Sequence, residues 1–251
     1  MDFFSNDGLQ FAYLDEGEGD PVLLLHGFAS SVRVNWINPG WVKTLTDAGY
    51  RVVAFDHRGH GRSSRSYESA DYTPSRMAGD AVACLDHLRL ERAHVFGYSM
   101  GARVAAFMAL AHPGRVATLI FGGLGIGMTE GVGDWDPIAE ALTADDPASI
   151  AHPRGKMFRA FADQTRSDRL ALAACIATSR QELTPAEMAR IAQPTLVAVG
   201  SKDDIGGPAA PLAAMMPDAE GFEIPGRDHM LSVGDRAFKA RVLEFLAAHP
   251  L

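Results

Sequence analysis

The segment Gly97-Tyr98-Ser99-Met100-Gly101 constrains the fold more than any other part of the chain. It follows the apolar run Ala93–Phe96, typical of a short buried strand, and it precedes apolar positions at helical spacing. A strand that turns directly into a helix needs small neighbours beside the turn, and Gly97 and Gly101 supply them. The pattern predicts a tight strand–turn–helix with the Ser99 hydroxyl exposed at the turn.

Strand patterns and helix patterns alternate along most of the chain. A strand, a crossover helix and a further strand, repeated in this way, predict a parallel sheet with helices on both faces. The two N-terminal strands are expected to form a hairpin. Strands are predicted at 2–5, 9–14, 22–25, 51–55, 93–96, 117–121, 195–199 and 221–224, and helices at 41–48, 74–90, 100–111 and 235–248.

The region 125–193 departs from this alternation. It contains helical pieces interrupted by four prolines and has no convincing strand pattern. We interpret it as a helical cap inserted over the sheet, so that residues 1–124 and 194–251 form an α/β core. The length of 251 residues is consistent with one structural domain overall.

The composition excludes several classes of protein. An apolar fraction of 47% and a charged fraction of 22% are ordinary for a globular protein, which argues against disorder. A net charge of −8 without a Lys/Arg cluster argues against a nucleic-acid partner. No apolar run is long enough to span a bilayer, and Met1–Phe4 lacks the basic region of a signal peptide. We expect a cytoplasmic protein without a membrane partner, whereas the oligomeric state is left open.

The two cysteines, Cys84 and Cys175, fall within predicted helices and show no CxxC or Cys/His spacing. Neither a disulfide framework nor a metal site is therefore indicated, and buried free thiols are expected.

A serine hydroxyl becomes a useful nucleophile when a histidine accepts its proton and a carboxylate orients that histidine. Among the histidines that follow the predicted turn, His152 lies in the cap and His249 lies beyond the last helix. His229 lies in the loop between the last strand and the last helix, where it can approach Ser99. For the carboxylate, the loop after the strand at 195–199 offers Asp203 and Asp204, and the residues alone leave both open.

Two backbone N–H groups are expected to stabilise an oxyanion beside Ser99. One belongs to Met100, because the first N–H groups of a helix have no partner inside it. The other belongs to Phe28 in the turn His26-Gly27-Phe28, where Gly27 allows a close approach of the backbone.

These motifs resemble the α/β-hydrolase superfamily, and the resemblance covers nearly the whole chain in the family's order. It implies an eight-stranded, mostly parallel sheet, a lid after the sixth strand and no cofactor. It favours Asp203 over Asp204 as the acid of the triad. It also implies that the segment 56–63 (Asp-His-Arg-Gly-His-Gly-Arg-Ser) is a structural turn rather than a catalytic or metal site.

The resemblance implies a carboxylesterase-like serine hydrolase that cleaves a small to medium apolar ester or lactone through an acyl-enzyme on Ser99. Hydrolases of C–C bonds and of enol-lactones share the same triad, and so does a ligand receptor that retains it. A small-molecule substrate is the expected partner. Candidate pocket residues, which ordinary packing would equally explain, are Phe28, Met128, Trp135, Met157, Phe158, Phe161 and Met230.

Overall fold

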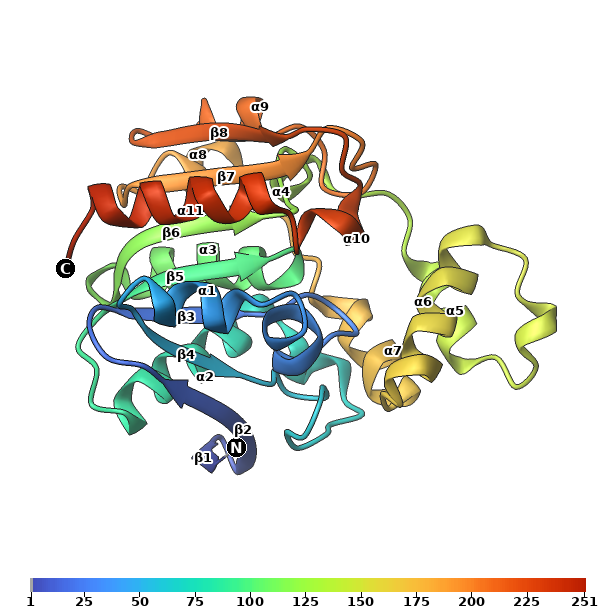
Figure 1. The fold of residues 1–251 in the computed structure, drawn as a ribbon. Helices are drawn as coiled ribbons and strands as arrows, with labels where there is room; N and C mark the ends of the chain where they lie inside the picture. The colour runs from blue at the N-terminus through green and yellow to red at the C-terminus, as the bar shows by residue number, and fades with distance from the viewer. Residues whose placement is uncertain (1) are drawn as a thin grey trace.

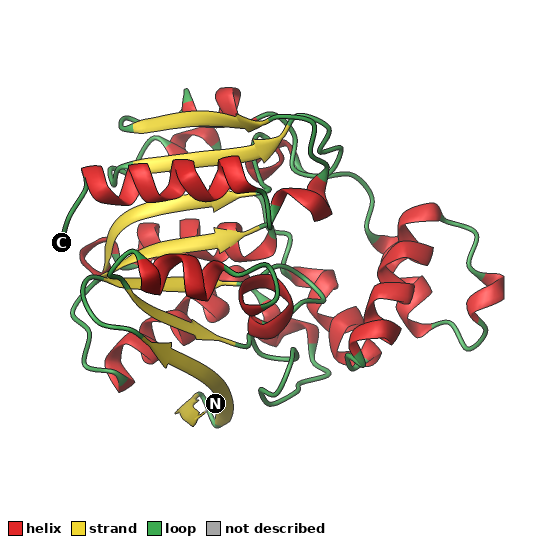
Figure 2. Cartoon of the chain, in the orientation of Figure 1, coloured by secondary structure: helices red, strands yellow, loops and turns green. Residues whose placement is uncertain are grey.

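The computed structural model describes residues 2–251 and contains one eight-stranded sheet, as the sequence predicts (Figure 1, Figure 2). The N-terminal strands β1 (Asp2–Asn6) and β2 (Leu9–Glu16) form an antiparallel hairpin. Strand β2 also pairs antiparallel with β4, and all remaining pairs are parallel. The order is β1-β2-β4-β3-β5-β6-β7-β8, with β3 (Pro21–Leu25), β4 (Arg51–Phe55), β5 (Ala93–Tyr98), β6 (Val116–Gly122), β7 (Thr195–Gly200) and β8 (Ala219–Ile224).

Helices cover both faces of the sheet, which explains why its strands are continuous apolar runs. Along β3, Val22 and Leu24 pack on one face, while Leu23 and Leu25 pack on the other. The first face carries α1 (Trp41–Asp47) and α11 (Arg236–Ala248), and the second carries α2 (Pro74–His87), α3 (Met100–Ala111) and α9 (Ala209–Ala213).

The segment between β6 and β7 is helical and contains no strand. Figure 1 shows α5, α6 and α7 projecting beyond the carboxyl ends of the parallel strands. Thr178, at the end of α7, donates a hydrogen bond to the Ser69 carbonyl oxygen at 2.5 Å and so ties this segment to the loop before α2. The helices are α4 (Gly127–Glu130), α5 (Asp136–Thr143), α6 (Pro153–Thr165), α7 (Arg169–Thr178) and α8 (Pro185–Met188).

Several short elements have no counterpart in the sequence-based prediction, among them η1 (Arg33–Ile37), α9 and α10 (His229–Ser232). The single π-helical turn η1 is closed by a bond of 2.9 Å from the Asn38 N–H to the Arg33 carbonyl oxygen. Helices α9 and α10 have only five and four residues. Elements this short are stabilised by packing and capping rather than by helix propensity, so periodicity does not reveal them.

Cys84 and Cys175 are both buried free thiols, as predicted. Within residues 2–251, no helix is both long enough and apolar enough to cross a bilayer.

Candidate active site

Ser99 lies at the turn between β5 and α3 in a strained backbone conformation, with φ 53° and ψ −111°. A Cβ atom at Gly97 would collide with the backbone of Gly101, and a Cβ atom at Gly101 would collide with the Leu25 carbonyl oxygen of β3, so α3 can lie this close to both strands only because these residues are glycines. The Ser99 N–H donates a hydrogen bond of 2.8 Å to the Gly122 carbonyl oxygen of β6. The strain is thus held by the sheet, and the Ser99 side chain lines a pocket.

His229 lies beside Ser99 at the start of α10. Its Nε2 atom is 3.1 Å from Ser99 Oγ, and its Nδ1 atom is 2.8 Å from Asp203 Oδ2. An ionised carboxylate only accepts hydrogen bonds, so Nδ1 carries the proton and Nε2 accepts from the serine hydroxyl. The three side chains therefore form one directed hydrogen-bond chain.

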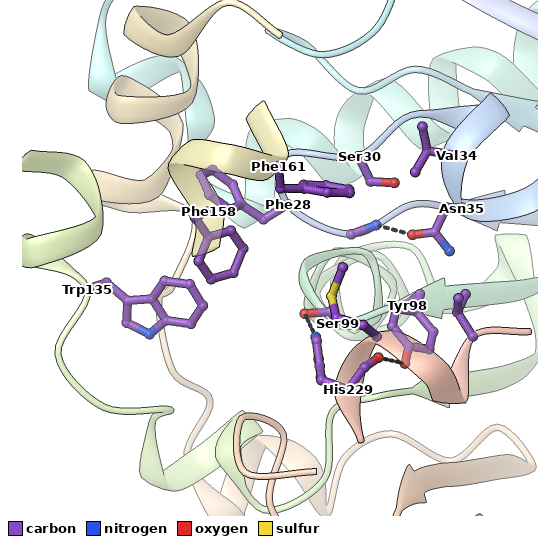
Figure 3. Close-up of a pocket in the computed structure, with 13 residues that line it drawn as sticks. Phe28, Ser30, Val34, Asn35, Tyr98, Ser99, Trp135, Phe158, Phe161 and His229 are labelled. Atoms are coloured by element: carbon purple, nitrogen blue, oxygen red, sulfur yellow. Dashed lines mark hydrogen bonds between the residues drawn. The ribbon is translucent and has the colours of Figure 1, made fainter. Parts of the chain in front are cut away.

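The position of His229 is fixed by its neighbours on two sides. The Tyr98 hydroxyl donates a hydrogen bond of 2.6 Å to the His229 carbonyl oxygen (Figure 3). Asp228 caps α10 by accepting bonds from the N–H groups of Met230 and Leu231 at 3.0 and 2.8 Å.

The Asp203 carboxylate is fully buried, with side-chain exposure of 0%. Its Oδ1 atom accepts bonds of 2.9 Å from the N–H groups of Ile205 and Gly206. Burial raises the pKa of the Asp203 carboxyl group, but the hydrogen bonds from His229 and these two N–H groups outweigh burial and hold the pKa below its ordinary value. Asp204 differs completely, because its side chain is 81% exposed and lies 3.8 Å from Arg154.

The turn that carries Gly27 and Phe28 passes close over Ser99. A Cβ atom built on Gly27 would lie 3.5 Å from Ser99 Cβ and 3.4 Å from the Tyr98 carbonyl oxygen, both contact distances. The Gly27 N–H donates to Asn35 Oδ1 at 3.0 Å, which anchors the turn to η1. Phe28 follows directly, and the Met100 N–H on the other side of Ser99 is the first of helix α3.

Two buried histidines, His26 and His60, form hydrogen bonds with the backbone of the turn that carries Gly27 and Phe28. His26 donates from Nδ1 to the Gly27 carbonyl oxygen at 2.8 Å, so its Nε2 accepts the His57 N–H at 3.0 Å. His60 similarly accepts the Ala29 N–H at 3.2 Å through Nε2. Burial lowers the pKa of His26 to about 4 and that of His60 to about 3, which keeps both rings neutral.

The segment 56–63, which contains His57 and His60, has the structural role expected of it. The Asp56 carboxylate accepts the N–H groups of Val32 at 2.7 Å and Arg62 at 2.8 Å. The bond from Val32 holds the loop after β4 against the segment that follows Phe28, and the bond from Arg62 closes the loop on itself.

A cavity of about 210 Å³ opens beside Ser99 and His229 (Figure 3). Of the predicted pocket residues, Phe28, Trp135, Phe158, Phe161 and Met230 line it. The Phe158 ring centroid lies 5.5 Å from that of Phe28 and 5.6 Å from that of Trp135, so aromatic rings from the turn, α6 and the residue before α5 form one wall.

Two predicted pocket residues lie elsewhere. Met128 belongs to α4 and is fully buried in the core, and Met157 is 38% exposed on α6, one residue before Phe158. The sequence indicated helical pieces in this region, but it did not show which of their side chains face the cavity. The structure adds lining residues that the sequence did not indicate, namely Ser30, Val34, Asn35, Tyr98 and Val233.

A model of the alpha/beta hydrolase fold family matches residues 20–173. The chain belongs to this family, which is the superfamily of hydrolases that its motifs resemble. The expected eight-stranded, mostly parallel fold is thereby confirmed.

Individual relatives differ in their named activities. Epoxide hydrolase B from Mycobacterium tuberculosis is 37% identical over 141 residues, which span 54% of this chain but only 38% of that protein. The crystal structure of a hydrolase from Pseudomonas aeruginosa is 29% identical, covers 97% of both chains and has a TM-score of 0.78. An esterase from a marine microorganism is 26% identical, covers 94% of this chain and 99% of that one, and has a TM-score of 0.76.

Proposed function

We propose that this chain is a serine esterase that hydrolyses small to medium apolar carboxylic esters or lactones through an acyl-enzyme on Ser99. The observation that carries the proposal is the directed chain of hydrogen bonds from Ser99 through His229 to Asp203. It supplies a nucleophile, a base and a group that orients the base, which are the three parts that acyl transfer requires.

In the first half-reaction, Ser99 Oγ attacks the ester carbonyl carbon while its proton moves to His229 Nε2. The buried Asp203 carboxylate stabilises the resulting imidazolium. The C–O bond to the alcohol then breaks, and Nε2 returns the proton to the leaving oxygen. In the second half-reaction, water attacks the acyl-enzyme with the same proton route, which releases the carboxylic acid and restores Ser99.

The N–H groups of Phe28 and Met100 are proposed to donate to the oxyanion of each tetrahedral intermediate. The close passage of Gly27 over Ser99 supports this assignment. Loss of one such donor typically costs about 3 kcal/mol of transition-state stabilisation, so the support of the turn by Asn35 and His60 is expected to matter for the rate.

The chemistry of Ser99 argues against epoxide opening, the activity named for one relative. A serine oxygen that attacks an epoxide carbon forms an alkyl ether, and an ether offers no carbonyl for water to attack. The covalent intermediate would not turn over, whereas the acyl-enzyme formed from an ester is itself an ester and can be hydrolysed.

Residues 125–193 are proposed to act as a cap on a core formed by 1–124 and 194–251. This division is supported by the three aromatic residues that the inserted segment places over the cavity, Trp135, Phe158 and Phe161. An apolar wall of this kind favours an apolar portion of the substrate.

Labelling with a fluorophosphonate probe tests the proposal directly. We expect the folded protein to be labelled on a peptide containing Ser99, and we expect Ser99→Ala to abolish both labelling and ester turnover. Ser149→Ala is a matched control, because Ser149 is exposed in the segment between α5 and α6. Unlabelled wild-type protein would refute the proposal, and turnover of vinylogous diketones in preference to esters and lactones would reassign the reaction to C–C bond hydrolysis.

A further inference from the structure

Two residues that line the cavity, Asn35 and Trp135, each have a buried side-chain N–H group without a partner among the described residues, and Asn35 is the one on the Gly27 side. Asn35 is 5% exposed, and within residues 2–251 its Nδ2 atom has no hydrogen-bond acceptor. A buried amide N–H group without a partner costs about 1–3 kcal/mol, so such an atom calls for an explanation. Asn35 belongs to the pocket lining, which makes a bound molecule a candidate acceptor.

The orientation of the Asn35 amide is determined by its other end. The Gly27 N–H is a donor and needs an oxygen, so Oδ1 must face Gly27, at the observed 3.0 Å. Nδ2 is consequently directed away from that bond. Figure 3 shows the Ser30 hydroxyl on the same side of the cavity as the Asn35 amide, opposite Trp135 and Phe158. The end of the cavity opposite these two rings, here called the polar end, therefore carries two polar side chains beside the Val34 side chain.

The polar end lies close to the reacting atoms. Both Asn35 Oδ1 and Ser99 Cβ lie 3.5 Å from the position of a Cβ atom built on Gly27, so they are within twice that distance of each other. The Asn35 amide thus belongs to the part of the cavity wall next to Ser99, where the substituents nearest the carbonyl carbon of a bound ester would lie.

We propose that Asn35 Nδ2 donates a hydrogen bond to the substrate, and that the protein prefers esters with an ether, hydroxyl or keto oxygen a few bonds from the scissile carbonyl. This inference deepens the proposed ester hydrolysis and rests on Ser99 reacting in this cavity. Asn35 is then a specificity-determining residue, because a methylene group in place of the oxygen leaves its N–H unpaired.

Two pairs of esters of equal shape test this inference. Methyl methoxyacetate and methyl butanoate differ by one oxygen in the acyl group, and 2-methoxyethyl butanoate and butyl butanoate differ by one oxygen in the alcohol. The variant Asn35→Asp keeps an oxygen for the Gly27 N–H but replaces the donor in the cavity by an acceptor. Asn38→Asp is the matched control, because it adds the same charge at the exposed end of η1.

The quantity measured is the ratio of kcat/KM within each pair, obtained from acid release at pH 8. Dividing the wild-type ratio by the variant ratio cancels the intrinsic reactivity of the esters and any uniform loss of rate. We expect the preference for the oxygen-containing ester in at least one pair to fall about fivefold or more in Asn35→Asp, the factor that a hydrogen bond of about 1 kcal/mol supplies, and to persist in Asn38→Asp.

A binding experiment separates this inference from the proposed function. The affinity of Ser99→Ala protein for each ester of the two pairs is measured by titration calorimetry. Tighter binding of the oxygen-containing ester that is lost when Asn35→Asp is added to Ser99→Ala would support the hydrogen bond from Asn35 Nδ2. This result would stand even if no ester were hydrolysed, in which case the esterase proposal alone would fail. If Asn35→Asp changed neither ratio by more than about twofold in kinetics or in binding, Nδ2 would have no substrate partner and the inference would be wrong.

Discussion

Replacing Asp203 by Asn tests the proposed triad at its most buried member. Oδ1 of Asp203 accepts two backbone N–H groups at 2.9 Å, so the carbonyl oxygen of an asparagine must occupy that position. Its NH2 group then faces His229 Nδ1, which lies 2.8 Å from the present Oδ2. A donor at that point forces Nδ1 to accept, and the neutral ring must carry its proton on Nε2 instead.

In that tautomer, His229 cannot accept the proton of Ser99 Oγ, although the atoms have scarcely moved. The variant also loses the carboxylate that stabilises the imidazolium. In a serine protease, the equivalent substitution lowers kcat by about 10⁴-fold, which corresponds to about 5.5 kcal/mol of transition-state stabilisation. We expect a loss of the same order here, with KM little changed because Asp203 does not line the cavity.

The assay is steady-state hydrolysis of a 4-nitrophenyl ester that the wild-type protein turns over, with circular dichroism to check that the variant is folded. Asp204→Asn is the control, since its 81% exposed side chain should leave kcat unchanged. A folded Asp203→Asn protein with kcat within tenfold of wild type would refute the tautomer argument. Full activity in Asp203→Asn together with a large loss in Asp204→Asn would move the acid by one residue.

Two further predictions concern stability. Asp80→Ala removes the carboxylate bonded through both oxygens at 2.8 Å to the Arg58 guanidinium, which is 1% exposed and keeps only the exposed Asp7 carboxylate, at 3.9 Å. The free energy of unfolding in urea should fall by about 3–5 kcal/mol, whereas Asp47→Ala, which breaks an exposed pair, should cost less than about 1 kcal/mol. Equal effects would contradict the burial argument. Because burial lowers the folded-state pKa of His26 from 6.5 to about 4 and that of His60 to about 3, the unfolded chain binds more protons below pH 6.5. Tm should therefore decline as the pH is lowered from 6.5 towards 3, and a constant Tm from pH 6.5 to 4 would show that these rings are not buried in neutral form.

The sheet was predictable because its strands are buried on both faces. The apolar runs at 22–25 and 51–55 correspond to β3 and β4 within one residue. Helix ends were less predictable. The pattern at 74–90 continued past His87, where α2 ends, because Leu88 and Leu90 pack on the core although Arg89 adopts a positive φ of 55°.

The candidate site was predictable where chemistry demands particular residue types in a particular order. Ser99 and His229 were selected in this way, whereas the family resemblance was needed to favour Asp203 over Asp204. The structure brings the Ser99, His229 and Asp203 side chains within hydrogen-bonding distance. Asn35 was missed because a single asparagine in a five-residue turn has no pattern around it. Its importance comes from a contact with Gly27, eight residues away, which only the folded backbone reveals.

The π-helical turn η1 also makes the length of this segment matter as much as its composition. The side chains of neighbouring residues in η1 face different surroundings. Asn35 lines the cavity, whereas the Trp36 ring is fully buried, with its centroid 4.8 Å from that of the Phe96 ring. Wide turns of this kind arise where one extra residue is accommodated in a helix. Deleting one residue from η1 would rotate the residues that follow it. The Trp36 indole would then be directed towards the cavity and the Asn35 amide towards the core. The segment should therefore tolerate exchange of its exposed side chains far better than any change in its number of residues.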